Sequence, residues 1–392
     1  MRMRKATSAL VGLLLAGVAA TPAHAETIRS KQWHLDSMQA EQMWKASNGA
    51  GITVAVIDTG VADVPELKGQ VLPGKDLAIG YEGDWRTDYE KHGTTMAAII
   101  AGSGKGPGGA DGAYGLAPGA KILPVRVSLG GPQQRPNQSM SEGIRFAADS
   151  DAKILNISMA SAGTSPELDE AVKYALSKGK LVFAGVGNDG ETSNQTKYPA
   201  ATPGVVGVAA IDRQANATKE SQHGPWVDVA APGADIVTAC GGKTGLCNSH
   251  GTSDATALAS ASAALLWSAH PDWTNNQVLR VLLNTAGKPR DGVARNDYIG
   301  YGVVRPRIAL TNPGDPGSAT EWPLPDLAAA PGGAKSPSGE AGKPGSGASA
   351  APAPAAAQGS DGLPWTWIGL GLGACVLIGG AVTAVVVRRQ NR

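Results

Sequence analysis

The sequence predicts an α/β fold of three layers, in which helices flank a mainly parallel central sheet, followed by a C-terminal transmembrane helix. Short apolar runs alternate with helical stretches through residues 49–312, and such alternation favours a parallel sheet covered on both faces. Residues 363–387, near the C-terminus, form an apolar segment that contains no charged residue and is long enough to cross a bilayer. A chain of 392 residues accommodates one large domain with appendages.

The predicted domain contains five apolar runs that are typical of buried strands: residues 52–57, 121–127, 154–158, 181–185 and 205–210. Helices are predicted at residues 93–100, 138–150, 165–178, 254–268 and 275–286. The third of these helices has the clearest boundaries, because Pro166 follows Ser165 at its start and Gly179 comes just after its end.

The N-terminus has the pattern of a signal peptide, residues 1–25. A basic start precedes an apolar run at residues 9–20, and Ala23-His24-Ala25 is typical of a cleavage site. We therefore expect the mature chain to begin at Glu26.

The segment 363–387 is expected to anchor the protein in the cell membrane by a single span. Trp365 and Trp367 stand at its start, and the basic tail 388–392 follows its end. Because positive flanks stay on the cytoplasmic side, the folded domain is expected outside the cytoplasm and the C-terminus inside it. Residues 313–362 are dominated by Pro, Gly, Ala and Ser, and are predicted to be a flexible linker.

The net charge bears on possible partners, and the cysteine content bears on the compartment. A net charge of +1 gives no electrostatic reason for nucleic acid binding. Cys240 and Cys247 are separated by a Gly-rich loop, which favours a disulfide in an oxidising compartment. Two free thiols remain the alternative, because spacing does not fix geometry. No cluster of acidic residues indicates a calcium site, and no metal or cofactor is predicted.

Three segments that lie far apart in the chain carry residues that fit one active site. Asp58 follows the first apolar run, His92 begins His92-Gly93-Thr94, and Ser253 ends Gly251-Thr252-Ser253 before a predicted helix. Asp58 is expected to orient His92, which takes the proton of the nucleophile Ser253. Each segment alone has an ordinary interpretation as a turn, a structural histidine or a serine N-cap. An aspartic protease would need a second Asp-Thr-Gly or Asp-Ser-Gly segment, which the chain lacks.

Asn188, in the Gly-rich segment 185–190, is the candidate side-chain donor to the oxyanion. Without the three other residues it would be interpreted as an Asn in a turn. The chain order Asp, His, Ser differs from the order in α/β-hydrolases and in chymotrypsin-like enzymes, and it is the order found in subtilisin.

Residues 49 to about 309 resemble the subtilisin-like serine protease family. Residues 115–120 resemble its G-[VL]-A-P-x-A stretch, and Tyr198-Pro199-Ala200 resembles its Y-P-A turn, where the proline peptide is commonly cis. Residues 156–160 resemble the strand that pairs with substrate and lines the S1 pocket. The resemblance implies a subtilisin-like fold and serine endopeptidase activity, with substrate-binding roles for Ser158, Met159, Ala160 and Gly187.

The order of segments narrows this resemblance to the mycosins, which are membrane-anchored proteases associated with type VII secretion systems. Residues 32–35 and 40–44 also resemble the mycosin N-terminal extension. The stretch from Glu26 to Asp58 is too short for a folded inhibitory propeptide plus the first strand, so we expect no removable prodomain. The resemblance implies a protein or peptide substrate and type VII secretion machinery as a partner.

The predicted organisation is a signal peptide 1–25, an N-terminal extension 26–48, a peptidase domain 49–312, a linker 313–362, a transmembrane helix 363–387 and a cytoplasmic tail 388–392. Two alternatives to a secretion-associated protease remain open. One is an anchored general-purpose subtilase, and the other is a structural subunit of a secretion complex with dispensable catalysis.

Two departures from the family pattern have consequences. Lys91 stands where Gly is usual, and its charge is expected to lower the pKa of His92. Ala160 replaces a usual Gly on the S1 strand, which predicts a narrow pocket and small P1 residues.

Overall fold

The computed structural model describes residues 26–128, 137–241 and 245–329. The predicted signal peptide 1–25, the transmembrane helix 363–387 and the tail 388–392 lie outside these ranges. Within them, no helix has the length and apolar character needed to cross a membrane.

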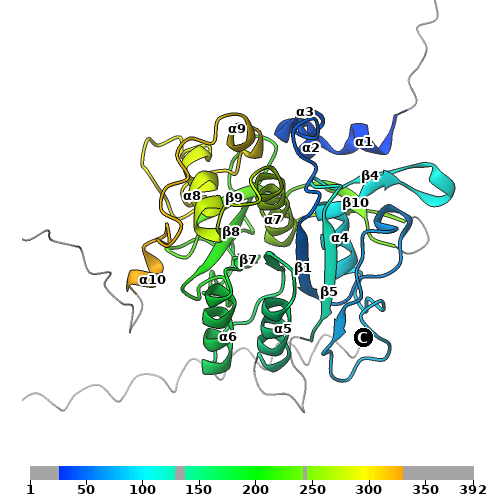
Figure 1. Cartoon of the computed structure of the whole chain (residues 1–392), viewed down its shortest axis with the longest axis horizontal. Helices are drawn as coiled ribbons and strands as arrows, with labels where there is room; N and C mark the ends of the chain where they lie inside the picture. Colours follow the sequence, from blue (N-terminus) through cyan, green and yellow to red (C-terminus); the bar gives the residue numbers. More distant parts are fainter. Residues whose placement is uncertain (1–25, 129–136, 242–244, 330–392) are drawn as a thin grey trace, which may run out of the picture. The chain divides into compact units, whose positions relative to one another are not determined.

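A seven-stranded sheet forms the centre of the domain (Figure 1), with strand order β2-β5-β1-β6-β7-β8-β9. All neighbouring strands in it are parallel. Its strands are β1 (Thr53–Asp58), β2 (Lys75–Asp76), β5 (Lys121–Arg126), β6 (Ile154–Ile157), β7 (Leu181–Gly185), β8 (Val205–Ile211) and β9 (Val229–Pro232). The five predicted strands are confirmed. The sequence did not predict β2 and β9, because β2 has two residues and β9 is a short segment that ends in proline.

Both faces of the sheet are buried, as β1 illustrates. Val54 and Val56 belong to one apolar core, whereas Ala55 and Ile57 belong to the other, because side chains alternate along a strand. Helices α4 (His92–Ala101), α7 (Thr252–Ala269) and α8 (Asn275–Thr285) contribute to the first core, and α5 (Gln138–Asp149) and α6 (Pro166–Ser177) to the second. This arrangement confirms the predicted three layers.

The N-terminal extension is an integral part of the domain. It forms α1 (Ile28–Lys31), α2 (Trp33–Met38) and α3 (Ala40–Met43). The wholly buried Gln32 donates to the carbonyls of Tyr114 at 2.8 Å and Val237 at 3.0 Å. Trp33 and Trp44 donate their indole N–H groups to Ala234 and Leu116 carbonyls. These contacts fix the extension to the body of the domain.

Two hairpins lie outside the central sheet. One pairs β3 (Ser103–Lys105) with β4 (Asp111–Tyr114), and the other pairs β10 (Ile236–Ala239) with β11 (Leu246–Ser249). The second hairpin contains the Cys240–Cys247 disulfide, with the two Cα atoms 5.9 Å apart. Short helices complete the described residues: η1 (Pro65–Leu67), η2 (Pro107–Gly109), α9 (Pro306–Thr311) and α10 (Asp326–Ala329).

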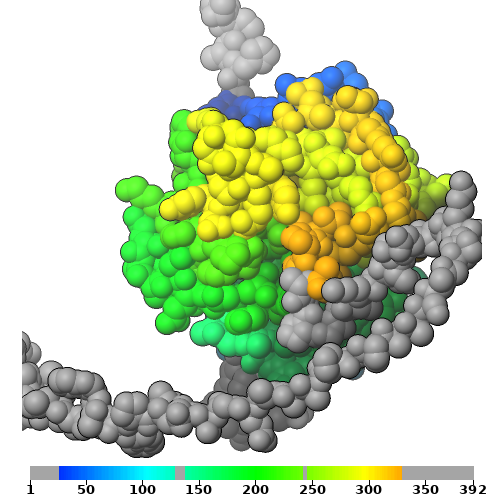
Figure 2. Space-filling view, turned by 90° about the vertical axis from the view of Figure 1, so that its left-hand side faces the viewer, coloured from blue at the N-terminus to red at the C-terminus, as the bar shows by residue number. Residues whose placement is uncertain are grey.

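The folded domain continues beyond residue 312, so the predicted start of the linker is wrong. Leu324 is buried in the first core. The guanidinium group of Arg280 donates to the carbonyls of Pro316, Ser318 and Glu321 at 2.7–2.9 Å. Figure 2 shows this stretch in orange, lying against the yellow part of the domain. A Pro- and Gly-rich composition did not prevent packing, because one arginine binds the backbone carbonyls of the irregular chain.

Candidate active site

The candidate site lies at a topological switch point of the sheet. Strands β5 and β6 follow each other in the main sheet but lie on opposite sides of β1. Ligands of open α/β sheets bind at the carboxyl ends of strands where the order reverses in this way. Asp58 is the last residue of β1, and Ser158 follows β6 directly.

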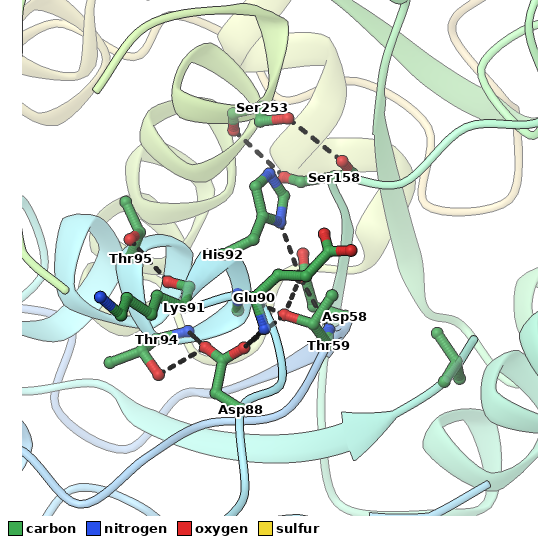
Figure 3. A network of polar contacts seen from close by, with 12 residues as sticks. Asp58, Thr59, Asp88, Glu90, Lys91, His92, Thr94, Thr95, Ser158 and Ser253 are labelled. Carbon is green, nitrogen blue, oxygen red and sulfur yellow. Dashed lines mark hydrogen bonds and ion pairs between the residues drawn. The ribbon is translucent and has the colours of Figure 1, made fainter. Parts of the chain in front are cut away.

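The structure brings Asp58 and His92 together. His92 Nδ1 lies 2.7 Å from Asp58 Oδ1, with the carboxylate wholly buried and the imidazole half-buried. Gly93 permits this approach, because a Cβ atom there would lie 2.1 Å from the Gly60 carbonyl oxygen. A hydrogen bond at Nδ1 holds the imidazole with Nε2 turned away from Asp58. Figure 3 shows the ring between Asp58 on one side and the Ser158–Ser253 pair on the other.

A second carboxylate, Asp88, supports the start of α4. Its Oδ2 accepts from the backbone N–H of Thr94 at 2.8 Å and from its hydroxyl at 2.6 Å, and its Oδ1 accepts from the Thr59 hydroxyl at 2.7 Å. The Thr59 Oγ1 in turn accepts from the Gly93 N–H at 3.0 Å. Two of the unpaired N–H groups at the helix N-terminus are satisfied in this way. The network visible in Figure 3 thereby fixes the backbone that carries His92.

The electrostatic environment favours a protonated His92. Burial alone lowers its pKa, but the charge and hydrogen bond of Asp58, with smaller effects of Asp254 and Asp88, raise the pKa to about 9. The net shift of the His92 pKa is therefore upward, and Lys91 is not among the groups that cause it. Lys91 is exposed, so water screens its charge, while the negative groups lie in buried surroundings.

Ser253 lies in the first turn of α7. Gly251 precedes the helix with φ 121° and ψ 178°, a backbone conformation that suits glycine. The Ser253 hydroxyl donates to the carbonyl oxygen of Ser158 at 3.1 Å, and the Ser158 hydroxyl donates to the Ser253 carbonyl at 3.1 Å. The nucleophile candidate therefore rests on the Ser158 backbone beside His92 and is not hydrogen-bonded to Nε2 in this conformation.

Asn188 is held by its amide oxygen. Oδ1 accepts from the Thr252 N–H at 2.9 Å and from the Thr252 hydroxyl at 3.0 Å. Within the described residues, the exposed Nδ2 group and the backbone N–H of Ser253 have no acceptor. Asn188 Nδ2 lies close to the start of α7, since a Cβ atom on Gly251 would be 2.9 Å from it. Two free donors thus lie at the positive end of α7.

The predicted substrate-binding residues fall into two groups. Ser158, Met159 and Ala160 follow β6, and Ser158 and Ala160 are partly exposed. The chain then pairs through Ser161 with Tyr198, whose peptide bond to Pro199 is cis. Gly187 differs from the other three, because its N–H donates to Thr252 Oγ1 and its carbonyl accepts from Gln222. Its backbone polar groups are therefore occupied within the protein.

Sequence reasoning missed three residues of this site. Asp88 and Thr59 lie within the network behind His92, and Asp254 is a wholly buried carboxyl next to Ser253. Thr59 was visible in the Asp-Thr-Gly segment, but Asp88 lies in an exposed loop without periodic pattern. An Asp after Ser253 has the appearance of an ordinary first-turn acid. In the described ranges, no group of three or more His, Cys, Asp and Glu residues is arranged to hold a metal ion.

A profile of the subtilase family (peptidase S8) matches residues 49–302. Mycosin-1 of Mycobacterium tuberculosis (strain ATCC 25618 / H37Rv) is 34% identical over 329 residues, which cover 70% of this chain and 72% of that protein. Subtilisin BL of Lederbergia lenta is 32% identical over 282 residues, 72% of this chain and 99% of that protein. The crystal structure of MycP1 from the ESX-1 type VII secretion system superposes with a TM-score of 0.63 at 30% identity, covering 74% of this chain and 88% of that one.

Proposed function

Because the chain belongs to the subtilase family and is a subtilisin-like serine endopeptidase of the mycosin type, we propose that Asp58, His92 and Ser253 are its catalytic triad. The observation that carries this proposal is the 2.7 Å contact between Asp58 and His92 Nδ1, made beside the Ser253–Ser158 pair. It gives a base, an orienting carboxylate and a hydroxyl nucleophile in the roles that acyl transfer requires.

The reaction begins with a rotation of the Ser253 side chain. Its hydroxyl leaves the Ser158 carbonyl and turns to His92 Nε2, which removes its proton as Oγ attacks the substrate carbonyl carbon. The imidazolium that forms is stabilised by Asp58, and the oxyanion accepts hydrogen bonds from Asn188 Nδ2 and from the Ser253 N–H. His92 then gives its proton to the leaving amine, and water hydrolyses the acyl-enzyme by the same route.

Ser158, Met159 and Ala160 are proposed to bind the substrate. The segment follows β6 directly and contacts Ser253 through Ser158. Once the Ser253 hydroxyl turns to His92, the Ser158 carbonyl oxygen can accept a hydrogen bond from the substrate. Ala160 adds a methyl group where the family pattern has Gly, so the pocket accepts small P1 side chains.

A casein-hydrolysis assay on the full-length chain tests the triad. The parent is expected to release peptides, whereas Ser253→Ala and His92→Ala abolish release. Ser253→Ala should keep the melting temperature of the parent, but His92→Ala should lower it because the buried Asp58 carboxylate loses its partner. Equal hydrolysis by the parent and Ser253→Ala would disprove the assignment.

We further propose that the enzyme is anchored in the cell membrane by residues 363–387, has its catalytic domain outside the cytoplasm, and acts in type VII secretion. The apolar segment with its basic flank and the similarity to a protease of an ESX-1 type VII secretion system support this. Alkaline carbonate extraction should leave the full chain in the membrane and release a version that ends at Gly362. Release of both would refute anchoring by this segment.

Two host strains separate catalysis from a structural role. One carries a deletion of the protein and the other carries Ser253→Ala. If secretion through the type VII system fails in both, the catalytic role is supported. If only the deletion blocks secretion, the protein serves as a structural subunit. Normal secretion in both would refute the assignment to this pathway.

A further inference from the structure

Asp254 is a buried carboxyl group that the reaction above leaves without a role. It follows Ser253 directly in the first turn of α7, and its side chain is fully shielded from solvent. Its Oδ1 accepts one hydrogen bond, from the Ser249 hydroxyl at 2.9 Å. Its Oδ2 is buried with no hydrogen-bond partner among the described residues.

Helix stabilisation does not account for this group. An acidic residue in the first turn does favour the helix dipole, but it does so from an exposed position at little cost. A carboxylate buried with an unpartnered oxygen is unfavourable unless nearby charge compensates it. A residue that serves only the helix would therefore be exposed or neutral here.

The groups around Asp254 come from three other elements. His92 begins α4, Ser249 ends β11 and is followed by His250, and Glu220 lies in the turn region after β8. Burial raises the pKa of Asp254 to about 7, the Ser249 hydrogen bond and the two histidines lower it, and Glu220 raises it. Glu220 is paired with His250, whose Nδ1 lies 3.2 Å from its Oε2 on the exposed side. The half-buried His92 and the exposed His250 are thus the cationic groups that act on Asp254, and of the two only His92 belongs to the proposed triad.

We propose that Asp254 is a positioning residue of the active site, a second buried carboxyl group that acts on His92 from the Ser253 side and makes catalysis depend on its own protonation. This inference rests on the proposed triad. Asp254 does not touch the reacting atoms, and it acts through His92 by charge.

The two protonation states have different effects on His92. An ionised Asp254 stabilises the imidazolium and makes His92 a stronger base, but it also keeps the ring protonated to higher pH. A neutral Asp254 removes both effects. With a pKa of about 7, Asp254 changes its charge near neutral pH, and the base strength of His92 changes with it.

The β10–β11 hairpin influences the effect of Asp254 on His92. Ser249 is the last residue of β11, which is joined to β10 by the Cys240–Cys247 disulfide. Its hydroxyl is the one hydrogen-bond donor to Asp254 in the described chain. The position of the hairpin therefore affects the protonation of Asp254.

The test measures the second-order rate of labelling by a fluorophosphonate probe from pH 5 to 10, on the full-length chain. The probe reports the nucleophilicity of the serine without dependence on a peptide substrate. The labelling rate should rise with pH as His92 loses its proton. In Asp254→Asn this rise should occur at a pH lower by roughly 0.5–1 unit, as expected for loss of one nearby negative charge. The plateau at high pH should fall by roughly two- to threefold, because the base is weaker.

A second variant keeps the carboxyl group and covers the possibility that Asp254→Asn does not fold. Ser249→Ala removes the hydrogen bond that favours the ionised form, so the pKa of Asp254 rises. Its profile should follow that of Asp254→Asn near pH 7 and that of the parent near pH 10. Asp228→Asn is the control, because Asp228 is a partly buried carboxyl group whose pKa is also raised by desolvation, to about 8, yet His92 is not among the groups acting on it. In Asp228→Asn the labelling rate should rise with pH over the same range as in the parent.

The outcomes separate the two proposals. If the parent is labelled, and Asp254→Asn and Ser249→Ala show the same pH dependence as the parent, the role of Asp254 is overturned and the triad is left in place. No labelling of the parent at any pH would overturn the triad, and with it the role of Asp254. An equal shift in Asp228→Asn would also overturn the inference, because the effect would then not be specific to this site.

Discussion

The sharpest quantitative prediction concerns Asn188. Its Oδ1 is fixed by two hydrogen bonds from Thr252, at 2.9 and 3.0 Å, while its Nδ2 group has no acceptor in the described structure. The donor is thus preorganised before substrate binds, and its hydrogen bond forms only when the oxyanion develops. An interaction made only in the transition state appears in kcat and leaves KM nearly unchanged.

For Asn188→Ala we expect kcat to fall by about 10²–10³, which corresponds to about 2.7–4 kcal/mol of transition-state stabilisation. The Ser253 N–H remains as a second donor, so activity is reduced and not abolished. Loss of the acceptor for Thr252 should lower the free energy of unfolding by about 1–2 kcal/mol, because part-buried donors lose their partner.

The assay is steady-state hydrolysis of a peptide substrate, with kcat and KM determined separately and thermal unfolding recorded for each variant. Asn216→Ala, which changes an exposed asparagine outside the site, is the control and should match the parent in kcat. A fall in kcat below about fivefold, or an effect confined to KM, would refute the assignment of Asn188 as an oxyanion donor.

Three further predictions follow from the same structure. Asp58→Asn should lower kcat by about 10⁴, because the amide holds the wrong tautomer of His92, and a kcat within tenfold of the parent would contradict this. In a P1-varied peptide library the parent should prefer Ala or Gly, and Ala160→Gly should extend cleavage to larger residues; efficient cleavage by the parent after Phe or Leu would exclude a narrow pocket. Desolvation raises the pKa of Asp228 in the folded state from its ordinary value of 3.8 to about 8, so its contribution to stability is complete below pH 3.8 and is lost as pH rises through about 8. Asp228→Asn should therefore gain melting temperature relative to the parent at pH 8 but not at pH 4, and equal differences at both values would show that burial does not shift this group.

The central α/β domain was predictable from local pattern. Runs such as residues 181–185 are apolar on every residue because parallel strands are buried on both faces, and the helix Pro166–Ser177 carries its own start and stop residues. The ends of the domain were not predictable in this way. Residues 313–329 have a linker-like composition, but Arg280 and the apolar core hold them in place.

In the candidate site, too, some residues were predictable from the sequence and others were not. Asp58, His92 and Ser253 stand in motifs with characteristic neighbours, so the sequence identified them as candidates. Asp88 acts through the first turn of α4, and the importance of Asp254 depends on its complete burial. Neither property is expressed in the residue type or in its spacing.

The central claim is that Ser253 is activated as a nucleophile by His92. The most direct measurement is to label the full-length chain with a fluorophosphonate and to map the modified peptide by mass spectrometry, with Ser253→Ala and His92→Ala as controls. Our account predicts a single adduct on Ser253, formed in the parent and absent from both variants. An adduct on another serine, or labelling that persists without His92, would contradict it.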